Sequence, residues 1–247
     1  MTGSAPRAWR LLRTGAGAPD FNMALDEALL RGGGAPALRL YAWNPPALSL
    51  GWFQPPEAFD RQAARAAGVL LVRRPTGGGA IHHEQELTFS LTAEPGRDGY
   101  PADAVEAYRW VHGVLAQALA AVGARAREHG GSRLSTRPRD ATLCFHDHTA
   151  LDLVDAAGRK LAGSAQRRVG ARVLHHGSLP LEVPALSPES GSVSLAAGRT
   201  VGWGELADAV TAAFAAALPA PLRPATPAPD ELAEAARLVA RGELLLS

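Results

Sequence analysis

Hydrophobic and polar positions follow two spacings along this chain, one helical and one extended. Within residues 20–30, Met23, Leu25, Ala28 and Leu29 recur among polar residues at helical spacing, which predicts a short amphipathic helix. Further along the first half, extended and helical patterns succeed one another. They predict strands over 38–43 and 47–53, a helix over 57–67, strands over 69–74 and 86–92, and a long helix over 103–122.

The second half contains three extended segments in quick succession, over 150–154, 158–168 and 171–183. The DAAG and VG sequences between them suit tight turns, so we expect a three-stranded antiparallel meander. A helix over 203–218 and a last helix from Asp230 complete the pattern.

Strands and helices do not alternate regularly, which favours an α+β fold with mixed or antiparallel sheets over a doubly wound parallel sheet. The Pro-rich connector at 219–229 is the one credible boundary. We therefore expect a main domain over residues 1–220 and a short helical tail over 221–247.

Charge and composition narrow the classes of function. Twenty-five basic and twenty-four acidic residues give a formal charge of +1, too little for the field of a dedicated nucleic-acid binder. No apolar stretch has the length of a signal peptide core or a membrane span, so we expect no membrane association. The single cysteine, Cys144, excludes a disulfide within the chain and suits the reducing cytoplasm. The histidines of HHG and HDH have no third and fourth ligand at a helical or loop spacing typical of metal sites, so we expect no bound metal.

The stretch RRPTGGGAIHH, residues 73–83, is the most informative one for chemistry. Consecutive glycines at 77–79 contribute nothing to a core, but they let backbone N–H groups approach a ligand. Arg73 and Arg74 offer charge for a phosphate or carboxyl group, and His83 offers a hydrogen bond. We expect the glycines to join the strand over 69–74 to the returning strand over 86–92, and a tight hairpin turn without a ligand explains them about as well.

Three other residue types have both a functional and an ordinary interpretation. Lys160 on a strand is by pattern alone a solvated surface charge, and Cys144 a small buried hydrophobe. A thiol beside a cation has a lowered pKa and becomes a nucleophile, which is the alternative for Cys144. His175 and His176 are adjacent on a strand, so only one of them faces any given pocket.

Five motifs in order resemble the biotin/lipoate A/B protein ligase superfamily over roughly residues 8–220. They are FNMALDEALL, LRLYAWNPPALSLGWFQ, RRPTGGGAIHH, GRKLAGSAQRR and VLHHGSLPLE. The resemblance implies a catalytic domain with a large and a small sheet, and an acyl pocket lined by Gly77, Gly78 and Gly79. It also implies that Lys160 binds the acyl carbonyl, that Gly163 and Ser164 leave room beside it, and that His176 faces the pocket.

The segment ATLCFHDHTALDL is most similar to the cysteine-dependent octanoyltransferases of lipoate synthesis. That resemblance implies that Cys144 accepts an octanoyl group from acyl carrier protein, without a cofactor. The group then passes to a lysine of a lipoyl-type acceptor, the glycine cleavage H protein or another lipoyl domain. HDHT stands where those enzymes tend to have a small residue, proline and serine. An ATP-dependent lipoate ligase and a non-catalytic lipoate- or octanoate-binding module are the alternatives, and the choice between octanoyl and lipoyl stays open.

Overall fold

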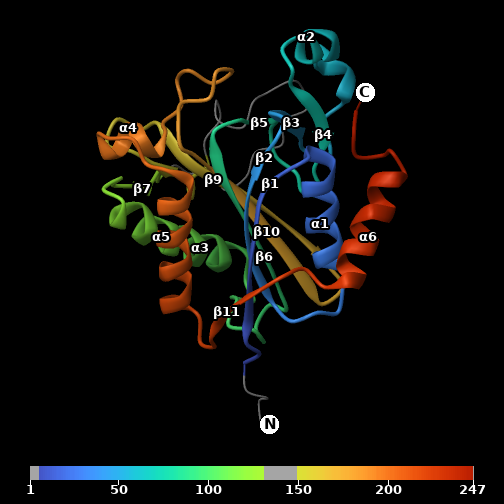
Figure 1. Cartoon of the computed structure of the whole chain (residues 1–247). Helices are drawn as coiled ribbons and strands as arrows, with labels where there is room; N and C mark the ends of the chain where they lie inside the picture. The colour runs from blue at the N-terminus through green and yellow to red at the C-terminus, as the bar shows by residue number, and fades with distance from the viewer. Residues whose placement is uncertain (1–5, 131–148, 247) are drawn as a thin grey trace.

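Two β-sheets of unequal size carry the fold in the computed structural model, which describes residues 6–130 and 149–246 (Figure 1). The strands of the large sheet are β1 (Trp9–Gly17), β2 (Ala37–Trp43), β6 (Glu86–Ala93), β7 (Arg127–Glu128), β8 (Leu153–Val154), β9 (Lys160–Val169), β10 (Arg172–Pro180) and β11 (Leu222–Ala225). Those of the small sheet are β3 (Ala47–Leu50), β4 (Leu70–Arg73) and β5 (Ile81–His83). The helices are α1 (Pro19–Arg31), α2 (Arg61–Ala66), α3 (Ala104–Ala121), α4 (Val193–Ala197), α5 (Trp203–Ala217) and α6 (Pro229–Ala240), with a short 3₁₀ turn, η1 (Pro56–Ala58).

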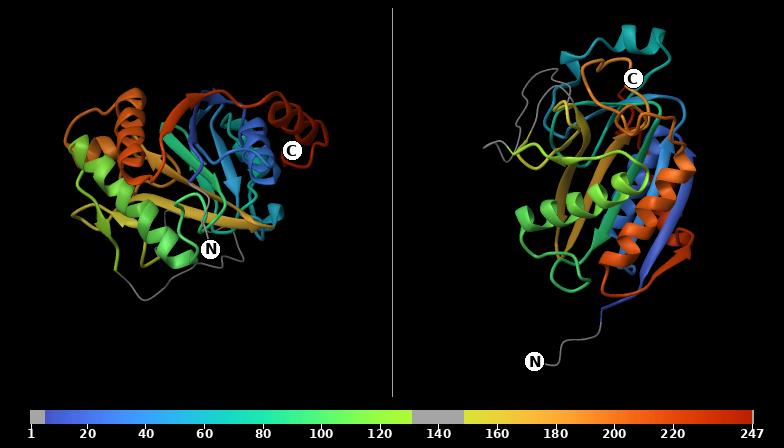
Figure 2. Two further views of the ribbon diagram at one scale, coloured as in Figure 1. Left: turned by 90° about the horizontal axis from the view of Figure 1, so that it is seen from below. Right: turned by 90° about the vertical axis from the view of Figure 1, so that its left-hand side faces the viewer.

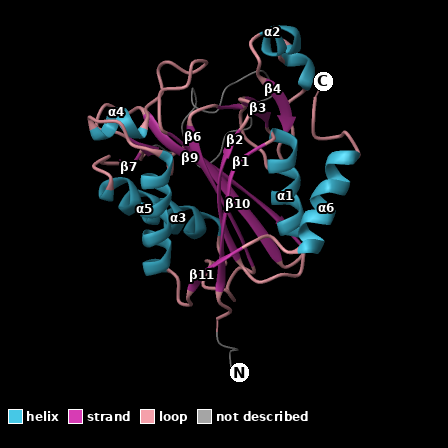
Figure 3. Ribbon diagram, viewed as in Figure 1, coloured by secondary structure: helices cyan, strands magenta, loops and turns pink. Residues whose placement is uncertain are grey.

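The large sheet is mixed, in the order β11-β1-β2-β6-β10-β9-β8-β7. Its β11–β1 and β1–β2 pairs are parallel, and the pairs from β2 onward are antiparallel. The small sheet has the order β4-β3-β5 and lies at one end of the large one (Figure 3). This arrangement confirms the α+β fold with a large and a small sheet.

Helices cover both faces of the large sheet, with α3 and α5 on one face and α1 and α6 on the other (Figure 2). Side chains alternate along a strand, so Leu11 packs with the α3 and α5 side whereas Leu12 packs with α1. Each fully buried leucine contributes roughly 1.5–3 kcal/mol to folding. The core therefore has two layers, divided by the sheet.

The predicted meander over 150–183 is confirmed as β8, β9 and β10, each antiparallel to the next. Gly170 lies in the β9–β10 turn with φ of +56°, a conformation that favours glycine. The register places Ala165 opposite His176 and Ser164 opposite Gly177. The hairpin therefore brings the GSAQ and HHG sequences side by side.

One strand pairing differs from the prediction. The glycine loop does not lead from β4 into the strand over 86–92 as its hairpin partner. It leads to β5, and both β4 and β5 pair with β3, whereas β6 pairs with β2 and β10 in the large sheet. Strand β6 is buried on both faces, so its side chains give no alternation that would identify its neighbours.

The N-terminal strand β1 and the helix α4 were not predicted, and the Pro-rich connector contains β11. β11 pairs with β1, α6 packs on α1, and Glu231 of α6 forms an ion pair with Arg10 at 2.6 Å. The backbone N–H of Arg73 also donates to the carbonyl of Leu244 at 2.9 Å. The division at residue 220 stays a prediction, since the tail contacts both sheets. No helix within 6–130 or 149–246 is long and apolar enough to span a bilayer.

Candidate active site

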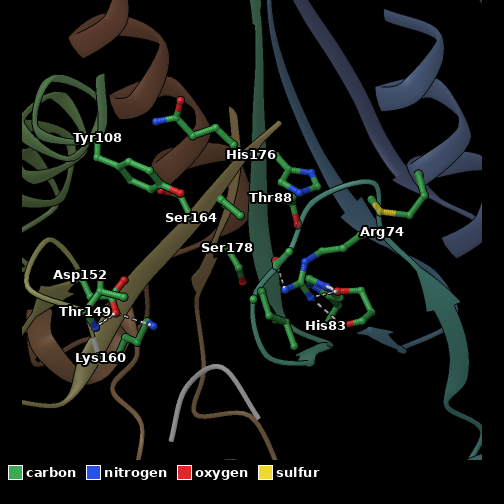
Figure 4. A pocket seen from close by; sticks show the side chains of 18 of the residues that line it. Arg74, His83, Thr88, Tyr108, Thr149, Asp152, Lys160, Ser164, His176 and Ser178 are labelled. Atoms are coloured by element: carbon green, nitrogen blue, oxygen red, sulfur yellow. Dashed lines mark hydrogen bonds and ion pairs between the residues drawn. The ribbon is translucent and has the colours of Figure 1, made fainter. Parts of the chain in front are cut away.

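A cavity of about 190 Å³ lies between the two sheets (Figure 4). Its lining combines apolar side chains with a few polar groups, the composition expected of a pocket for a largely apolar ligand. The residues are Met23, Tyr41, Trp43, Ser49, Arg74, Gly77, Gly78, Ile81, His83, Thr88, Tyr108, Thr149, Leu151, Asp152, Lys160, Ser164, Ala165, Gln166, His176, Gly177 and Ser178. Both sheets, α1, α3 and the glycine loop therefore contribute to one site.

Lys160 begins β9 and is buried in the cavity wall, with 2% of its side chain exposed. Its Nζ lies 2.8 Å from Oδ2 of Asp152, which also accepts the backbone N–H of Thr149 at 2.7 Å. A buried ammonium requires such a partner, because desolvation of an unpaired charge is costly. Figure 4 shows these three residues together on one side of the cavity.

Gly163 acts on this lysine without lining the cavity. A Cβ atom at Gly163 would lie 2.6 Å from Cε and 3.0 Å from Nζ of Lys160. The missing side chain therefore provides the space that the lysine occupies. The predicted room beside Lys160 is used by the lysine itself.

The guanidinium group of Arg74 fixes the glycine loop through hydrogen bonds to its backbone. Its Nη2 donates to the carbonyls of Gly77 and Gly79, each at 2.7 Å, and its Nη1 donates to the carbonyl of Ser49 at 2.8 Å. Gly78 has φ of +97°, which favours glycine. The arginine thus ties the glycine loop to the backbone of β3, while its side chain still lines the cavity.

Arg73 points elsewhere, although the sequence offered it for the same site. Its Nη1 donates to the carbonyls of Gly51, Trp52 and Gln54, at 2.9, 3.1 and 2.8 Å. Its backbone belongs to β4, where side chains alternate, so it faces away from its neighbour Arg74. Arg73 is therefore placed to stabilise the loop after β3.

His176 lines the cavity and belongs to a buried charge network. Its Nδ1 lies 3.1 Å from Oδ2 of Asp26, and its Nε2 lies 2.7 Å from Oγ1 of Thr76. Asp26 also accepts from Arg39 at 2.8 Å and from Tyr41 at 2.9 Å. Burial lowers the pKa of His176, although the bond to Asp26 opposes this. A neutral His176 then donates from Nδ1 to Asp26 and accepts from Thr76.

The carboxyl group of Asp26 is the charged centre of this network. Burial alone would raise its pKa, but Arg39 and the hydrogen bond from His176 lower it below the usual range. The ionised carboxylate fixes α1 against β2 and β10, the strands that carry Arg39 and His176. It thereby holds one wall of the cavity.

His83 occupies a second network, in the small sheet. Its Nδ1 lies 2.8 Å from Oε1 of Glu86, its Nε2 lies 2.7 Å from Oγ of Ser49, and its ring stacks on Trp43 with centroids 3.9 Å apart. Glu86 also accepts from Thr88 and Ser178 of the large sheet. Burial would raise the pKa of Glu86, and His83 and the hydroxyl donors lower it instead. This network joins the two sheets across the cavity.

Of the site residues predicted from the sequence, most that lie in the described ranges line the cavity. They are Arg74, Gly77, Gly78, His83, Lys160, Ser164 and His176. Gly79 and Gly163 support residues of the lining, since the Gly79 carbonyl accepts a hydrogen bond from Arg74 and the absent side chain of Gly163 leaves space for Lys160. Arg73 binds the loop after β3 instead. Cys144 and the first three residues of the HDHT sequence, 146–148, fall outside the described residues, whereas Thr149, the last of them, lines the cavity.

Sequence reasoning missed the carboxylates Asp26, Glu86 and Asp152. One signal was available for Asp26, which lies three residues after Met23 on the apolar face of the predicted helix. A carboxylate there is buried and needs a partner, which Arg39 provides. Nothing comparable marked Glu86 or Asp152, because hydrophobic periodicity does not show that Glu86 meets His83 or that Asp152 meets Lys160.

Comparison with protein families now adds to the geometry. Residues 18–191 match the model of the lipoyl protein ligase A/B catalytic domain. The chain belongs to this family. The match covers the cavity wall from α1 through β10, so the site lies within the family's catalytic domain.

Curated relatives and solved structures agree with this assignment. The chain is 40% identical to the octanoyltransferase LipM of Symbiobacterium thermophilum over an alignment of 263 positions, which covers 94% of each chain. It is 41% identical to LipM of Kyrpidia tusciae over 194 residues, covering 74% of this chain and 69% of the relative. A structure described as the bipartite lipoate protein ligase of Thermoplasma acidophilum and its E2 lipoyl domain superposes on this chain with a TM-score of 0.74 at 22% identity. The superposition covers 96% of this chain and 93% of the other, and it shows the shared fold. The two LipM relatives confirm the predicted class of enzyme, an octanoyltransferase.

Proposed function

We propose that this chain transfers an octanoyl group from acyl carrier protein through a Cys144 thioester to a lysine of a lipoyl-type acceptor. The buried ammonium of Lys160, held by Asp152 in the wall of a cavity with apolar lining, is the observation that best supports this chemistry. A preorganised cation in a water-poor site stabilises the oxyanion that forms when a thiolate or an amine adds to a thioester carbonyl. The LipM relatives support octanoyl as the acyl group.

The first step exchanges one thioester for another. The thiolate of Cys144 attacks the carbonyl carbon of the carrier thioester, a C–S bond forms, and the bond to the carrier sulfur breaks. The carrier leaves as a thiolate and takes up the proton that the Cys144 thiol released, so no proton is gained or lost overall. Free energy changes little because both species are thioesters, and the enzyme-bound one stays reactive toward an amine.

In the second step the acceptor lysine attacks the Cys144 thioester. A C–N bond forms, the C–S bond breaks, and an amide is left on the acceptor. The amine must lose a proton, and both ring nitrogens of His83 and of His176 are already in hydrogen bonds. We propose that the departing thiolate of Cys144 takes this proton.

The cavity suits a medium-length acyl chain. Met23, Tyr41, Trp43 and Ile81 provide apolar lining. Burial of seven carbons beyond the carbonyl contributes roughly 5–6 kcal/mol at about 0.8 kcal/mol for each CH₂ group. That contribution selects octanoyl over short acyl groups, and it applies to the carbon chain of lipoyl as well.

We propose that the acceptor is the glycine cleavage H protein or another lipoyl domain. We also propose that the transfer takes place in the cytoplasm. The lipoate protein ligase of T. acidophilum, which is described together with its E2 lipoyl domain, shares the fold of this chain. Phe53, 82% exposed, lies against Gly77 at the cavity, since a Cβ atom on Gly77 would be 3.8 Å from its ring. An exposed aromatic ring beside the site is suited to contact the acceptor.

Intact-mass analysis after incubation with octanoyl carrier protein tests the covalent step. We expect an octanoyl adduct on wild type and its transfer to an added lipoyl domain without ATP and magnesium. Cys144→Ser should lose transfer, and unchanged transfer by this variant would remove the covalent mechanism. Transfer of free octanoate that requires ATP and magnesium would instead identify a ligase. Binding of octanoate without acylation in either assay would identify a non-catalytic module.

A further inference from the structure

Two buried histidines from different elements meet at one serine hydroxyl in the cavity wall. Nε2 of His112 in α3 and Nε2 of His175 in β10 lie 2.7 and 2.8 Å from Oγ of Ser164. At the outer ends, Nδ1 of His112 contacts the carbonyl oxygen of Leu151, and Nδ1 of His175 lies 2.8 Å from the hydroxyl of Tyr100. A continuous hydrogen-bonded chain therefore runs from Tyr100 to Leu151.

The groups at its Leu151 end determine where each hydrogen lies. The Leu151 carbonyl only accepts, so Nδ1 of His112 carries the hydrogen. A neutral His112 then has a bare Nε2, which accepts the hydroxyl hydrogen of Ser164. Because Ser164 has one hydrogen to donate, Nε2 of His175 must donate to Ser164. The bare Nδ1 of His175 then accepts from Tyr100.

Burial favours these protonation states at every member. It lowers the pKa of His112, and it lowers the pKa of His175 well below the usual range, so both rings are neutral near pH 7. Burial raises the pKa of Tyr100, which therefore keeps its hydrogen. All hydrogens in the chain point toward Leu151. A carbonyl cannot pass a proton on, so the chain orients groups and does not conduct protons.

The hydrogen-bonded chain ends at Leu151, next to the Asp152–Lys160 ion pair that the proposed function uses. The carbonyls of Ala150 and Asp152 accept backbone N–H groups of Gly130 and His129, and the carbonyl between them, that of Leu151, goes to His112. The segment is therefore fixed from two sides. Its next side chain is Asp152, whose carboxylate holds Lys160.

We propose that His112 is a positioning residue of the transfer reaction, which fixes Leu151 so that Asp152 presents the Lys160 ammonium to the acyl carbonyl. This inference rests on the role of Lys160 in the proposed function. It also defines what Ser164 does in the cavity. With its hydrogen given to His112, Ser164 accepts hydrogen bonds from a substrate but does not donate them.

Long-range ¹H–¹⁵N NMR on histidine-labelled protein reads the two tautomers directly. We expect the Nδ1–H form at His112 and the Nε2–H form at His175, assigned with single His→Gln variants. The Nε2–H form at His112 would overturn the proposal, because that ring could not then donate to Leu151. This measurement needs no turnover, so it is independent of the transfer assay.

Steady-state transfer kinetics test the consequence for catalysis. His112→Phe keeps the ring shape and removes both hydrogen bonds, and we expect kcat to fall by between about tenfold and 10²-fold with KM for the acyl donor unchanged. His112→Asn retains a donor near Nδ1 and should restore part of the loss. Tyr100→Phe cuts the far end of the chain and should keep kcat within about twofold.

A wild-type kcat in His112→Phe, or an equal loss in Tyr100→Phe, would overturn the positioning role. Should His112→Phe fail to fold, His112→Asn and the tautomer measurement still decide the proposal. The activity of Lys160→Met distinguishes a failure of the proposed function from a failure of the inference about His112. If Lys160→Met keeps full kcat, the proposed function of the lysine fails. If it is inactive while His112→Phe is fully active, only the inference about His112 fails.

Discussion

The carboxylate of Asp152 lies 2.8 Å from the ammonium of Lys160, with 5% and 2% of the two side chains exposed. A buried ion pair adds little net stability, because desolvation offsets the attraction. The ion pair instead fixes the position of the ammonium, which is held at one point of the cavity wall before a substrate arrives. The predictions below test this placement and the networks that support it.

Replacement of Lys160 should abolish most of the activity. Lys160→Met removes the cation that stabilises the oxyanion, and we expect kcat to fall by about 10²–10³-fold. The neighbouring Arg159, 39% exposed and paired with Asp155, provides a matched control. Arg159→Met should change kcat little, as measured by acyl transfer to a lipoyl domain. Similar losses in both variants would contradict a specific role for Lys160.

Asp152→Asn tests the partner alone. The amide oxygen still accepts the N–H of Thr149, but the negative charge beside Lys160 is gone. We expect a loss of kcat smaller than that of Lys160→Met, together with reduced stability, because breaking a buried pair costs about 3–5 kcal/mol. Denaturant unfolding and transfer assays on the same preparation measure both effects. A variant with wild-type stability and kcat would show that the pair is dispensable.

Gly163→Ala should separate activity from stability. The new Cβ would meet Cε of Lys160 at 2.6 Å, and the end of a lysine side chain moves more easily than backbone. We therefore expect nearly unchanged folding and a loss of kcat of about tenfold or more, because the ammonium is displaced. Gly113→Ala, in open space on α3, is the control and should stabilise the helix by about 0.5–1 kcal/mol without a change in kcat. Full activity in Gly163→Ala would argue against the placement of Lys160.

Stability should fall as the pH drops below about 6.5. Burial lowers the pKa values of His112, His175 and His176 in the folded chain, so the unfolded chain binds more protons between the two values. Each such histidine contributes a slope of up to about 1.4 kcal/mol per pH unit, with stability rising toward neutral pH. Asp26 acts in the same direction at lower pH, since its lowered pKa makes stability fall as the pH drops below about 4.

Urea unfolding at pH 5, 6, 7 and 8 measures this dependence. His175→Gln should flatten the slope between pH 5 and 6.5, because one buried group that resists protonation is lost. Equal free energies of unfolding at pH 5 and 7 would contradict the inferred neutral histidines.

Periodicity and motifs predicted most of the elements but not the pairing of the strands. The meander that carries Lys160 and His176 was predictable because its strands are consecutive in sequence and joined by short turns. The partner of β6 was not, since its neighbours β2 and β10 come from distant segments. The same holds for the site, where Lys160 followed from a motif but Asp152 did not. Which carboxylate meets which cation depends on the register of strands, and no local pattern encodes it.

An ion pair between α6 and β1 links the tail over residues 221–247 to the large sheet. Glu231 of α6 is 6% exposed, pairs with Arg10 of β1 at 2.6 Å, and accepts the N–H of Ala228 at the start of its own helix. Glu231→Ala should therefore destabilise the whole molecule by about 1–3 kcal/mol, or roughly 2–4 °C in Tm for each kcal/mol. Glu234→Ala, at an exposed pair within α6, should change stability by less than about 1 kcal/mol. If Glu231→Ala leaves the main calorimetric transition in place and adds a separate early one, residues 221–247 unfold independently. A shift of one single transition would show that the tail is part of the catalytic domain.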